Sequence, residues 1–170
     1  NTIDYITIAS AGNVADFGNL SASRRGGSGV GSETRGISMG GSSPSAYVNI
    51  IEFMTFASLG NATDFGNLGA SRRLHTSASN GHGGLIVNFP RAPELYSPTG
   101  KVVPRGAGVG QRLLAFGGYT DAYVKTIDTL TISTLGNMTN FGESNELQQS
   151  PDGCSSSTRG VCINGSAPSS

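Results

Sequence analysis

The sequence predicts an all-β protein built from three repeats, and three observations lead to that prediction. The stretch 60–68 (GNATDFGNL) appears earlier as residues 12–20 and returns in altered form as residues 136–144. Short β-branched and aromatic runs alternate with turn formers, and 26 of the 170 residues are glycine. Only 13% of the residues are charged. A pattern that recurs in this way is typical of repeat architectures.

Chain length and net charge limit the classes of function that we expect. The chain is long enough for one ordinary domain, and its 11 basic and 11 acidic residues balance. We therefore expect no nucleic-acid partner, because no net field would attract one. No apolar run approaches the roughly 20 residues of a membrane helix, so no membrane insertion is expected. The first residue is Asn1 rather than methionine, as in a processed protein or an excerpt.

The first repeat covers residues 1–46. It opens with a β-forming run at 3–9, followed by a turn and the signature, whose members are Asp16, Phe17 and Leu20. The glycine- and serine-rich stretch 26–31 is expected to be a loop. The repeat closes with a short strand at 34–39 that ends in the pair Gly40-Gly41.

The second repeat covers residues 47–122 and the third covers 123–170. The second carries the signature as Asp64, Phe65 and Leu68, and an insert at about 74–101 delays its closing strand, 112–116. The third begins with a strand at 127–133 and retains Phe141, but it lacks the leucine and the arginine pair of the other repeats.

The opening strand of each repeat is apolar on both faces, which is typical of a strand covered on both sides. A unit of this size cannot cover itself, so the repeats are expected to stack. This favours small sheets packed around an axis, as in the blades of a β-propeller. Propellers typically have about four to eight blades. We therefore expect a ring completed by other chains or by missing sequence.

The repeat resembles the kelch motif. Gly40-Gly41 corresponds to the kelch diglycine, Phe53 and Phe65 to its aromatic position, and Leu68 and Arg72 to the hydrophobic residue and arginine that follow. The stretches IDYITIAS, DFGNL and CSSSTRGV are similar to repeats of tailed-phage virion proteins, which are often tail fibre or structural proteins. This resemblance implies a kelch-like propeller or fibre module on the virion, an extracellular particle.

The same resemblance implies a structural role, with host-surface attachment as a second role. The implied partners are further copies of the chain or other virion proteins, and a host-surface glycan. The alternative is a secreted or cell-surface carbohydrate-binding β-propeller. No paired carboxylates, P-loop or Ser-His-Asp arrangement stands in a convincing context, so we expect no enzyme activity and no cofactor.

Within the signature, the aspartates are expected to bind nearby backbone amides in a turn, because Asn140 replaces them in the third repeat. The phenylalanines Phe17, Phe65 and Phe141 are expected to anchor one blade to the next. Two equivalent sets of charged residues are expected to form ion pairs with a structural role. Each pair would add roughly 0–1 kcal/mol to stability if it is exposed. They are Arg35, Arg112 and Arg159, and Asp4, Glu52 and Asp128.

Candidate recognition residues lie near the insert. Arg72 and Arg73, like Arg24-Arg25, would suit acidic glycans, and a solvated loop is the alternative. His75 and His82 are further candidates; no carboxylate or thiol lies close enough in sequence to complete a metal site with them. We therefore expect no metal.

Cys154 and Cys162 flank a short polar stretch. If a three-residue loop centred on Thr158 joins two antiparallel strands, the cysteines face each other and a disulfide is feasible. Two free thiols buried as small hydrophobes are the alternative.

Overall fold

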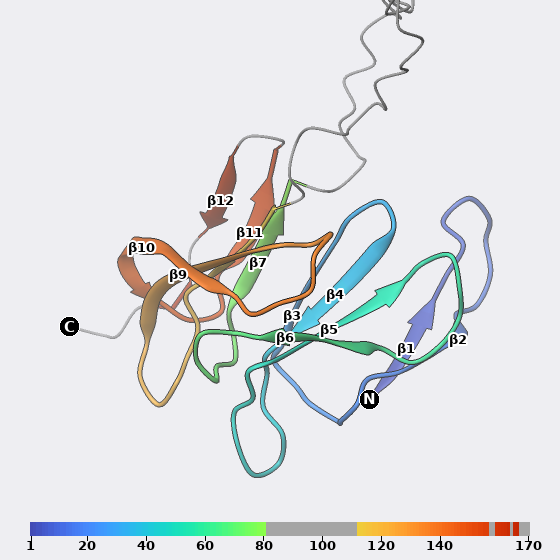
Figure 1. The fold of residues 1–170 in the computed structure, drawn as a ribbon, viewed down its shortest axis with the longest axis horizontal. Helices are drawn as coiled ribbons and strands as arrows, with labels where there is room; N and C mark the ends of the chain where they lie inside the picture. The colour runs from blue at the N-terminus through green and yellow to red at the C-terminus, as the bar shows by residue number, and fades with distance from the viewer. Residues whose placement is uncertain (81–111, 157–158, 164, 167–170) are drawn as a thin grey trace, which may run out of the picture.

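The computed structural model describes residues 1–80, 112–156, 159–163 and 165–166. Within these residues the chain forms antiparallel β-sheets and no helix, which confirms the all-β class (Figure 1). No helix in this part of the chain is long and apolar enough to cross a membrane. The strands, in chain order, are β1 (Thr2–Tyr5), β2 (Ala15–Asn19), β3 (Ser28–Gly31), β4 (Arg35–Met39), β5 (Ile50–Thr55), β6 (Thr63–Asn67), β7 (Thr76–Ser79), β8 (Arg112–Phe116), β9 (Val124–Thr131), β10 (Thr139–Gln148), β11 (Asp152–Ser155) and β12 (Gly160–Ile163).

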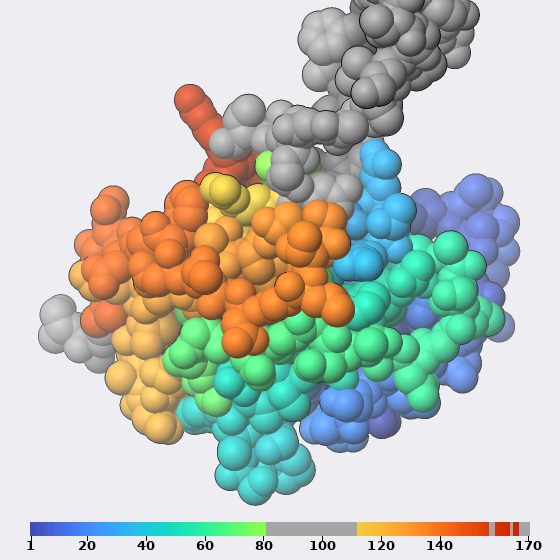
Figure 2. Space-filling view, in the orientation of Figure 1, coloured from blue at the N-terminus to red at the C-terminus, as the bar shows by residue number. Residues whose placement is uncertain are grey.

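The strands form two four-stranded sheets and two two-stranded sheets. The larger sheets run β3-β4-β5-β6 and β7-β8-β9-β10, each a simple antiparallel meander. The smaller sheets are β1-β2 at the N-terminal end and β11-β12 at the C-terminal end. Figure 2 shows the chain from its blue N-terminal end on the right to its orange residues on the left.

The sheets do not coincide with the expected repeat boundaries. Strands β3 and β4 belong to residues 1–46, yet they pair with β5 and β6 from residues 47–122. In the same way, β7 and β8 pair with β9 and β10 from residues 123–170. We call residues 1–46, 47–122 and 123–170 the three segments of the chain. Each four-stranded sheet therefore takes two strands from each of two consecutive segments. Two strands are left over at either end of the described chain.

Two sequence-based boundaries were wrong. The stretch 26–31 was expected to be a loop, but Ser28–Gly31 forms β3 because it pairs with β4 along its whole length. The insert was expected to begin at about residue 74, but Thr76–Ser79 forms β7 and is buried throughout. The rest of the insert, including His82, lies outside the described residues. Each strand contains a single β-former, Val30 in β3 and Thr76 in β7, and pairing within the sheet overrides the weak local preference of the remaining residues.

The small residues of β3 and β7 have a packing role. These strands lie side by side without a backbone ladder, and serine side chains join them. The Ser77 hydroxyl lies 2.6 Å from that of Ser28, and the Ser79 hydroxyl donates to the Gly31 carbonyl at 2.7 Å. On the other side of β7, the Ser155 hydroxyl of β11 donates to the Ser79 carbonyl at 2.6 Å. Glycine and serine let the neighbouring backbones approach closely enough for these bonds.

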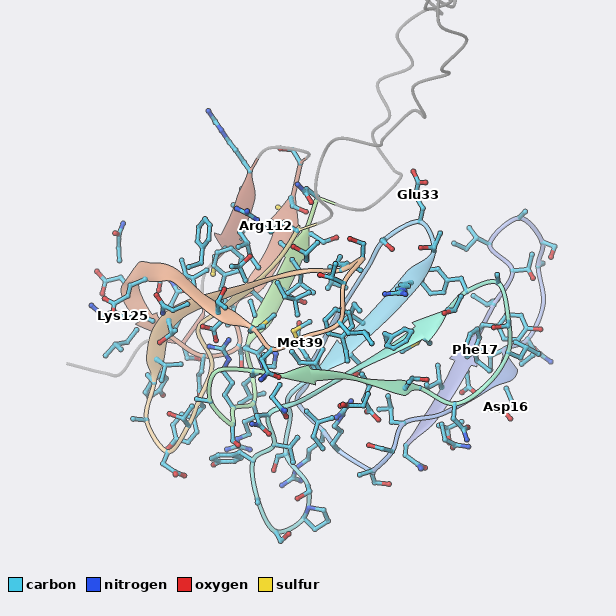
Figure 3. The ribbon with its side chains drawn as sticks, in the orientation of Figure 1. Asp16, Phe17, Glu33, Met39, Arg112 and Lys125 are labelled. Atoms are coloured by element: carbon cyan, nitrogen blue, oxygen red, sulfur yellow. The ribbon has the colours of Figure 1, made fainter. Side chains whose placement is uncertain are left out.

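The hydrophobic core lies between the two larger sheets. Ile51 and Met39 of one sheet and Leu113 of the other are fully buried and belong to one cluster, which also includes Ile132 and Phe65. Figure 3 places Met39 inside the molecule and Asp16 and Lys125 at opposite edges. Ile51 and its neighbour Glu52 are both buried although they point to opposite faces of β5. The expectation that the opening strand is covered on both sides is therefore confirmed for β5.

A glycine pair ends each of β4 and β8. Gly40 and Gly41 have φ of +57° and +105°, and Gly117 and Gly118 have +59° and +114°. The space is also closed to side chains, since a Cβ on Gly40 would lie 2.6 Å from the His75 ring. Glycine is therefore required at these strand ends for both backbone conformation and close approach.

Candidate functional site

A buried ion pair joins each pair of consecutive segments. Arg72 Nη2 donates to Asp128 Oδ2 at 2.7 Å, and both side chains are almost completely buried. Arg24 forms the corresponding pair with Glu52, and its Nη2 also donates to the Ser38 hydroxyl at 3.2 Å. Each arginine follows the second strand of one segment, and each acid lies on the first strand of the next. The pairs therefore connect neighbouring segments rather than facing solvent.

These pairs correct two sequence-based predictions. The acidic residues were expected to pair with Arg35, Arg112 and Arg159, whereas Glu52 and Asp128 pair with Arg24 and Arg72. Arg35 instead donates to the Ile132 carbonyl at 3.1 Å and stacks on Phe53, with 4.7 Å from Cζ to the ring centroid. Arg72 was a candidate glycan-binding residue, but it is only 1% exposed. Burial lowers the pKa of Arg72, and the carboxylate of Asp128 opposes that shift.

A second contact joins the signature to the preceding segment. The Gly60 N–H donates to the Phe17 carbonyl at 2.8 Å, and the Asn61 side-chain oxygen accepts from the Asn19 N–H at 3.0 Å. Gly136 and Asn137 make the same two bonds to Phe65 and Asn67, at 3.0 and 2.9 Å. We call this pairing the Gly-Asn contact. A Cβ on Gly18 or Gly66 would lie 2.2 or 2.3 Å from the carbonyl oxygen of Gly60 or Gly136, so the contact requires glycine there.

The signature residues therefore divide into several roles. Phe17, Phe65 and Leu68 are buried, Leu20 is partly buried, and Phe141 is exposed. Asp16 and Asp64 lie exposed on β2 and β6, and neither side chain hydrogen-bonds a described backbone amide. The expected turn role of the aspartates is therefore wrong. Asn61 and Asn137 make the bonds that connect the segments instead. Asparagine recurs at 13, 61 and 137 in the sequence, and this signal could have identified them.

Arg73 lies in a cluster of tyrosines from the inter-segment linkers. Its guanidinium carbon is 5.1 Å from the Tyr47 ring centroid and 5.6 Å from that of Tyr119. Tyr119 makes edge-to-face contacts with both Tyr47 and Tyr123, at centroid distances of 6.1 and 5.7 Å. All four side chains are partly exposed. Sequence reasoning selected the arginine and missed the tyrosines, which lie far from it along the chain.

His75 is buried beside Arg72 instead of exposed in a binding loop. It lies between Gly40 and Gly118, and neither ring nitrogen has a hydrogen-bond partner within the described residues. Burial, aided by the nearby Arg72 charge, lowers the pKa of His75 to about 3. The ring is therefore neutral at physiological pH. Across the ranges that the structure covers, no three His, Cys, Asp or Glu residues are grouped to hold a metal ion.

The two cysteines are free thiols and are not opposite each other. Cys154 pairs with Val161 across the β11-β12 ladder, whereas Cys162 pairs with Gly153. The described ladder, in which Ser155 pairs with Gly160, is offset by one residue from the register that would place the cysteines opposite each other. The thiols consequently point to opposite faces. Cys162 donates to Gln148 Oε1 at 3.1 Å, and partial burial raises the pKa of its thiol.

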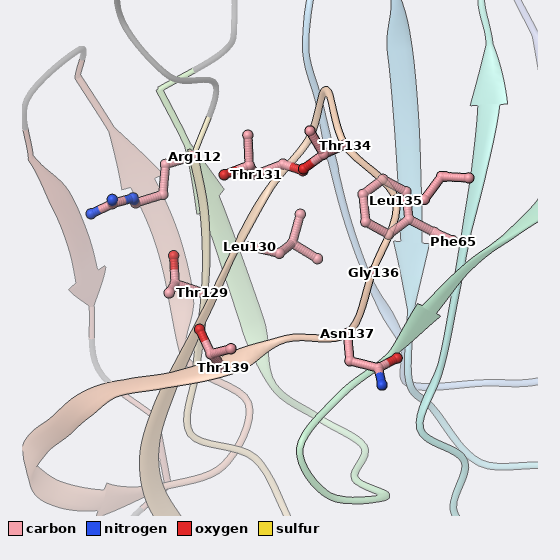
Figure 4. A pocket seen from close by; sticks show the side chains of 10 residues that line it. All are labelled: Phe65, Arg112, Thr129, Leu130, Thr131, Thr134, Leu135, Gly136, Asn137 and Thr139. Atoms are coloured by element: carbon pink, nitrogen blue, oxygen red, sulfur yellow. The ribbon is translucent and has the colours of Figure 1, made fainter.

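A polar hollow of about 310 Å³ lies where the β9-β10 turn meets β6 (Figure 4). The buried side chains Phe65 and Leu130 line it together with threonine hydroxyls and the Asn137 amide, and Arg112 lies at its edge with its guanidinium directed away from the other labelled side chains. This lining offers hydrogen-bond donors and acceptors beside one aromatic ring. The lining residues are Phe65, Arg112, Thr129, Leu130, Thr131, Thr134, Leu135, Gly136, Asn137 and Thr139.

No protein-family model matches the chain, and no curated protein matches it.

Replacing Asp128 by alanine tests the buried pair. Asp128→Ala would leave the Arg72 guanidinium buried without its charge partner, so we expect the free energy of unfolding to fall by about 3–5 kcal/mol. Urea denaturation followed by circular dichroism measures this. Glu143→Ala is the matched control, because its pair with Lys125 is exposed, and it should leave stability nearly unchanged. Equal losses for the two variants would contradict a buried, connecting pair.

His75 predicts a specific pH dependence of stability. The unfolded chain takes up a proton near pH 6.5, while the folded chain does so only near pH 3. Stability should therefore fall as pH falls between these values, by at most about 1.4 kcal/mol per pH unit. His75→Leu removes the titrating group, so its unfolding free energy should vary less between pH 7 and 5. Parallel profiles for wild type and His75→Leu would disprove the assignment.

Proposed function

We propose that this chain is a structural module of a tailed-phage virion, such as a tail fibre or surface appendage. In it, kelch-like units pack in series as β-propeller blades, with a structural role and a surface for attachment to the host. The proposal includes no catalytic activity and no cofactor. Its partners are further copies of the chain or other virion proteins, and its location is the extracellular particle.

One observation carries the proposal: the junction between consecutive segments is built in the same way twice. Arg24–Glu52 and Arg72–Asp128 occupy corresponding places, and both junctions have a Gly-Asn contact. Charged groups that sequence reasoning considered for ligand binding are used in these junctions. Such construction suits a module whose task is to hold a rigid shape. The virion location rests on the resemblance of the repeat to those of phage structural proteins.

Particle fractionation tests the virion role. We expect the chain to co-sediment with infectious particles in a density gradient, at a stoichiometry that is constant across preparations. Quantitative mass spectrometry of the gradient fractions measures this, with an abundant host cytosolic protein as the control for contamination. A chain found only in the particle-free fractions would refute the virion role.

The second candidate is a carbohydrate-binding β-propeller, and the hollow at the β9-β10 turn favours it. Threonine hydroxyls and the Asn137 amide line this hollow, and Arg112 lies at its edge. Sugars present hydroxyl groups that such donors and acceptors can bind. Arg112 adds a cation within 5.9 Å of the Phe141 ring centroid, which suits an acidic sugar.

A glycan array with purified chain tests this second candidate. If an acidic glycan binds in the hollow, Arg112→Ala should weaken binding about tenfold or more, because a charge-assisted hydrogen bond is lost. Arg159→Ala is the matched control, since Arg159 is exposed and does not line the hollow. An array without bound glycans, or equal weakening by both variants, would argue against a binding site there.

A further inference from the structure

The two small sheets are halves of the arrangement seen in the larger ones. In each larger sheet, the fourth strand of one segment pairs with the first strand of the next, as β4 pairs with β5 and β8 with β9. Among the described residues, β12 pairs only with β11, and β1 pairs only with β2. One edge of β12 and one edge of β1 therefore carry unpaired backbone donors and acceptors, which can accept another strand.

The Gly-Asn contact is also open at both ends. Gly142 follows Phe141 as Gly66 follows Phe65, yet nothing lies within 4 Å of a Cβ built on Gly142. Phe141 is 52% exposed, whereas Phe17 and Phe65 are 8% and 3% exposed beneath the following segment. At the other end, Gly12-Asn13 precedes β2 as Gly60-Asn61 precedes β6 and makes no described contact of this kind.

The ion-pair position is likewise incomplete at both ends. Gln148 takes the place of Arg24, because it contacts Cys162 as Arg24 contacts Ser38. Its side-chain oxygen is used by that contact, and its amide N–H groups donate to no described residue. Asp4 on β1 corresponds to Glu52 and Asp128, but it has no partner in the described chain. An amide donor and a carboxylate acceptor are thus left at opposite ends.

Exposed apolar side chains lie on the same two strands that have unpaired backbone edges. Ile163 on β12 is 48% exposed, although Met39 and Phe116 at the corresponding positions are 0% and 6% exposed. Val161 on β12 and Tyr5 on β1 are also exposed. If β12 met a β1 strand in the register of β4 and β5, Val161 would face Tyr5 as Ile37 faces Phe53, and Cys162 would face Asp4 as Ser38 faces Glu52.

We propose that copies of this chain associate head to tail, with β11-β12 of one copy and β1-β2 of a second forming one four-stranded sheet. Gln148 donates to Asp4 of the second copy, and Gly12-Asn13 of the second copy docks on Phe141-Gly142. The occupant is a second copy because each open group at one end has its complement at the other. Two copies would supply six sheets, a number that closed rings of blades accommodate. The inference rests on the serial packing in the proposed function and is independent of the virion location.

Sedimentation velocity of the purified chain over a range of concentrations tests the association. We expect an assembly of at least two copies that dissociates on dilution. Gly142→Ala should raise the dissociation constant at least about tenfold, because its Cβ would meet the Gly12 carbonyl of the second copy. Gly136→Ala is the matched control: its φ of +148° resembles the +158° of Gly142, and its Cβ also has open space. It should strain the fold similarly and leave association unchanged.

A gain-of-affinity variant and a covalent trap define the register. Gln148→Arg restores the ion pair of the other junctions, so the dissociation constant should fall about tenfold. In a Cys154→Ser background, Asp4→Cys should form a disulfide between copies with Cys162, since facing strand residues lie within disulfide reach. Thr2→Cys, on the same strand but out of register, should not.

These measurements can overturn the inference without reference to phage particles. A chain that stays monomeric at all concentrations refutes the association. Assembly that is equally sensitive to Gly142→Ala and Gly136→Ala, or that Asp4→Cys does not trap, refutes the head-to-tail register. A chain that assembles as expected but is absent from virions would instead refute the proposed function alone.

Discussion

The arginine–carboxylate pair between consecutive segments is the interaction on which the arrangement of the sheets depends. Arg72 and Asp128 come from different segments, and both are buried where water cannot replace the missing partner. An unpaired charge at this depth is strongly unfavourable, so the two strands that carry the pair must lie together. Arg24 and Glu52 impose the same condition one segment earlier. A buried pair of this kind specifies which strands are neighbours more than it adds stability.

The packing around the pairs depends on residues that have little or no side chain. Gly18 and Gly66 let the next segment's turn approach their backbones, and Gly40 leaves room for the buried His75 ring. Serines on β7 form hydrogen bonds with β3 and accept one from β11. Much of the glycine and serine content therefore serves close approach between sheets. A composition that resembles a loop-rich or low-complexity chain is here a requirement of tight packing.

The interior is consequently unusual in its polarity. Alongside a hydrophobic cluster it contains two ion pairs and a neutral histidine without a hydrogen-bond partner in the described chain. Among the described residues, the candidate surfaces for ligands are the Arg73–tyrosine cluster, the hollow beside Phe65 and the unpaired sheet edges. Functional contacts are therefore expected where segments meet or remain unmatched, and the centre of each segment serves the scaffold.

The sequence by itself determined the β class, the opening strands and the recurrence of the signature, because alternating β-formers and turn residues act locally. It also identified Phe65 and Leu68 as packing residues, since apolar side chains in a recurring pattern are normally buried. Only the tertiary structure decided that Arg72 pairs with Asp128, that Ser28–Gly31 and Thr76–Ser79 are strands, and that Asn61 rather than Asp64 ties the signature to its neighbour. Each of these depends on contacts between residues far apart in the chain, which local preferences do not encode.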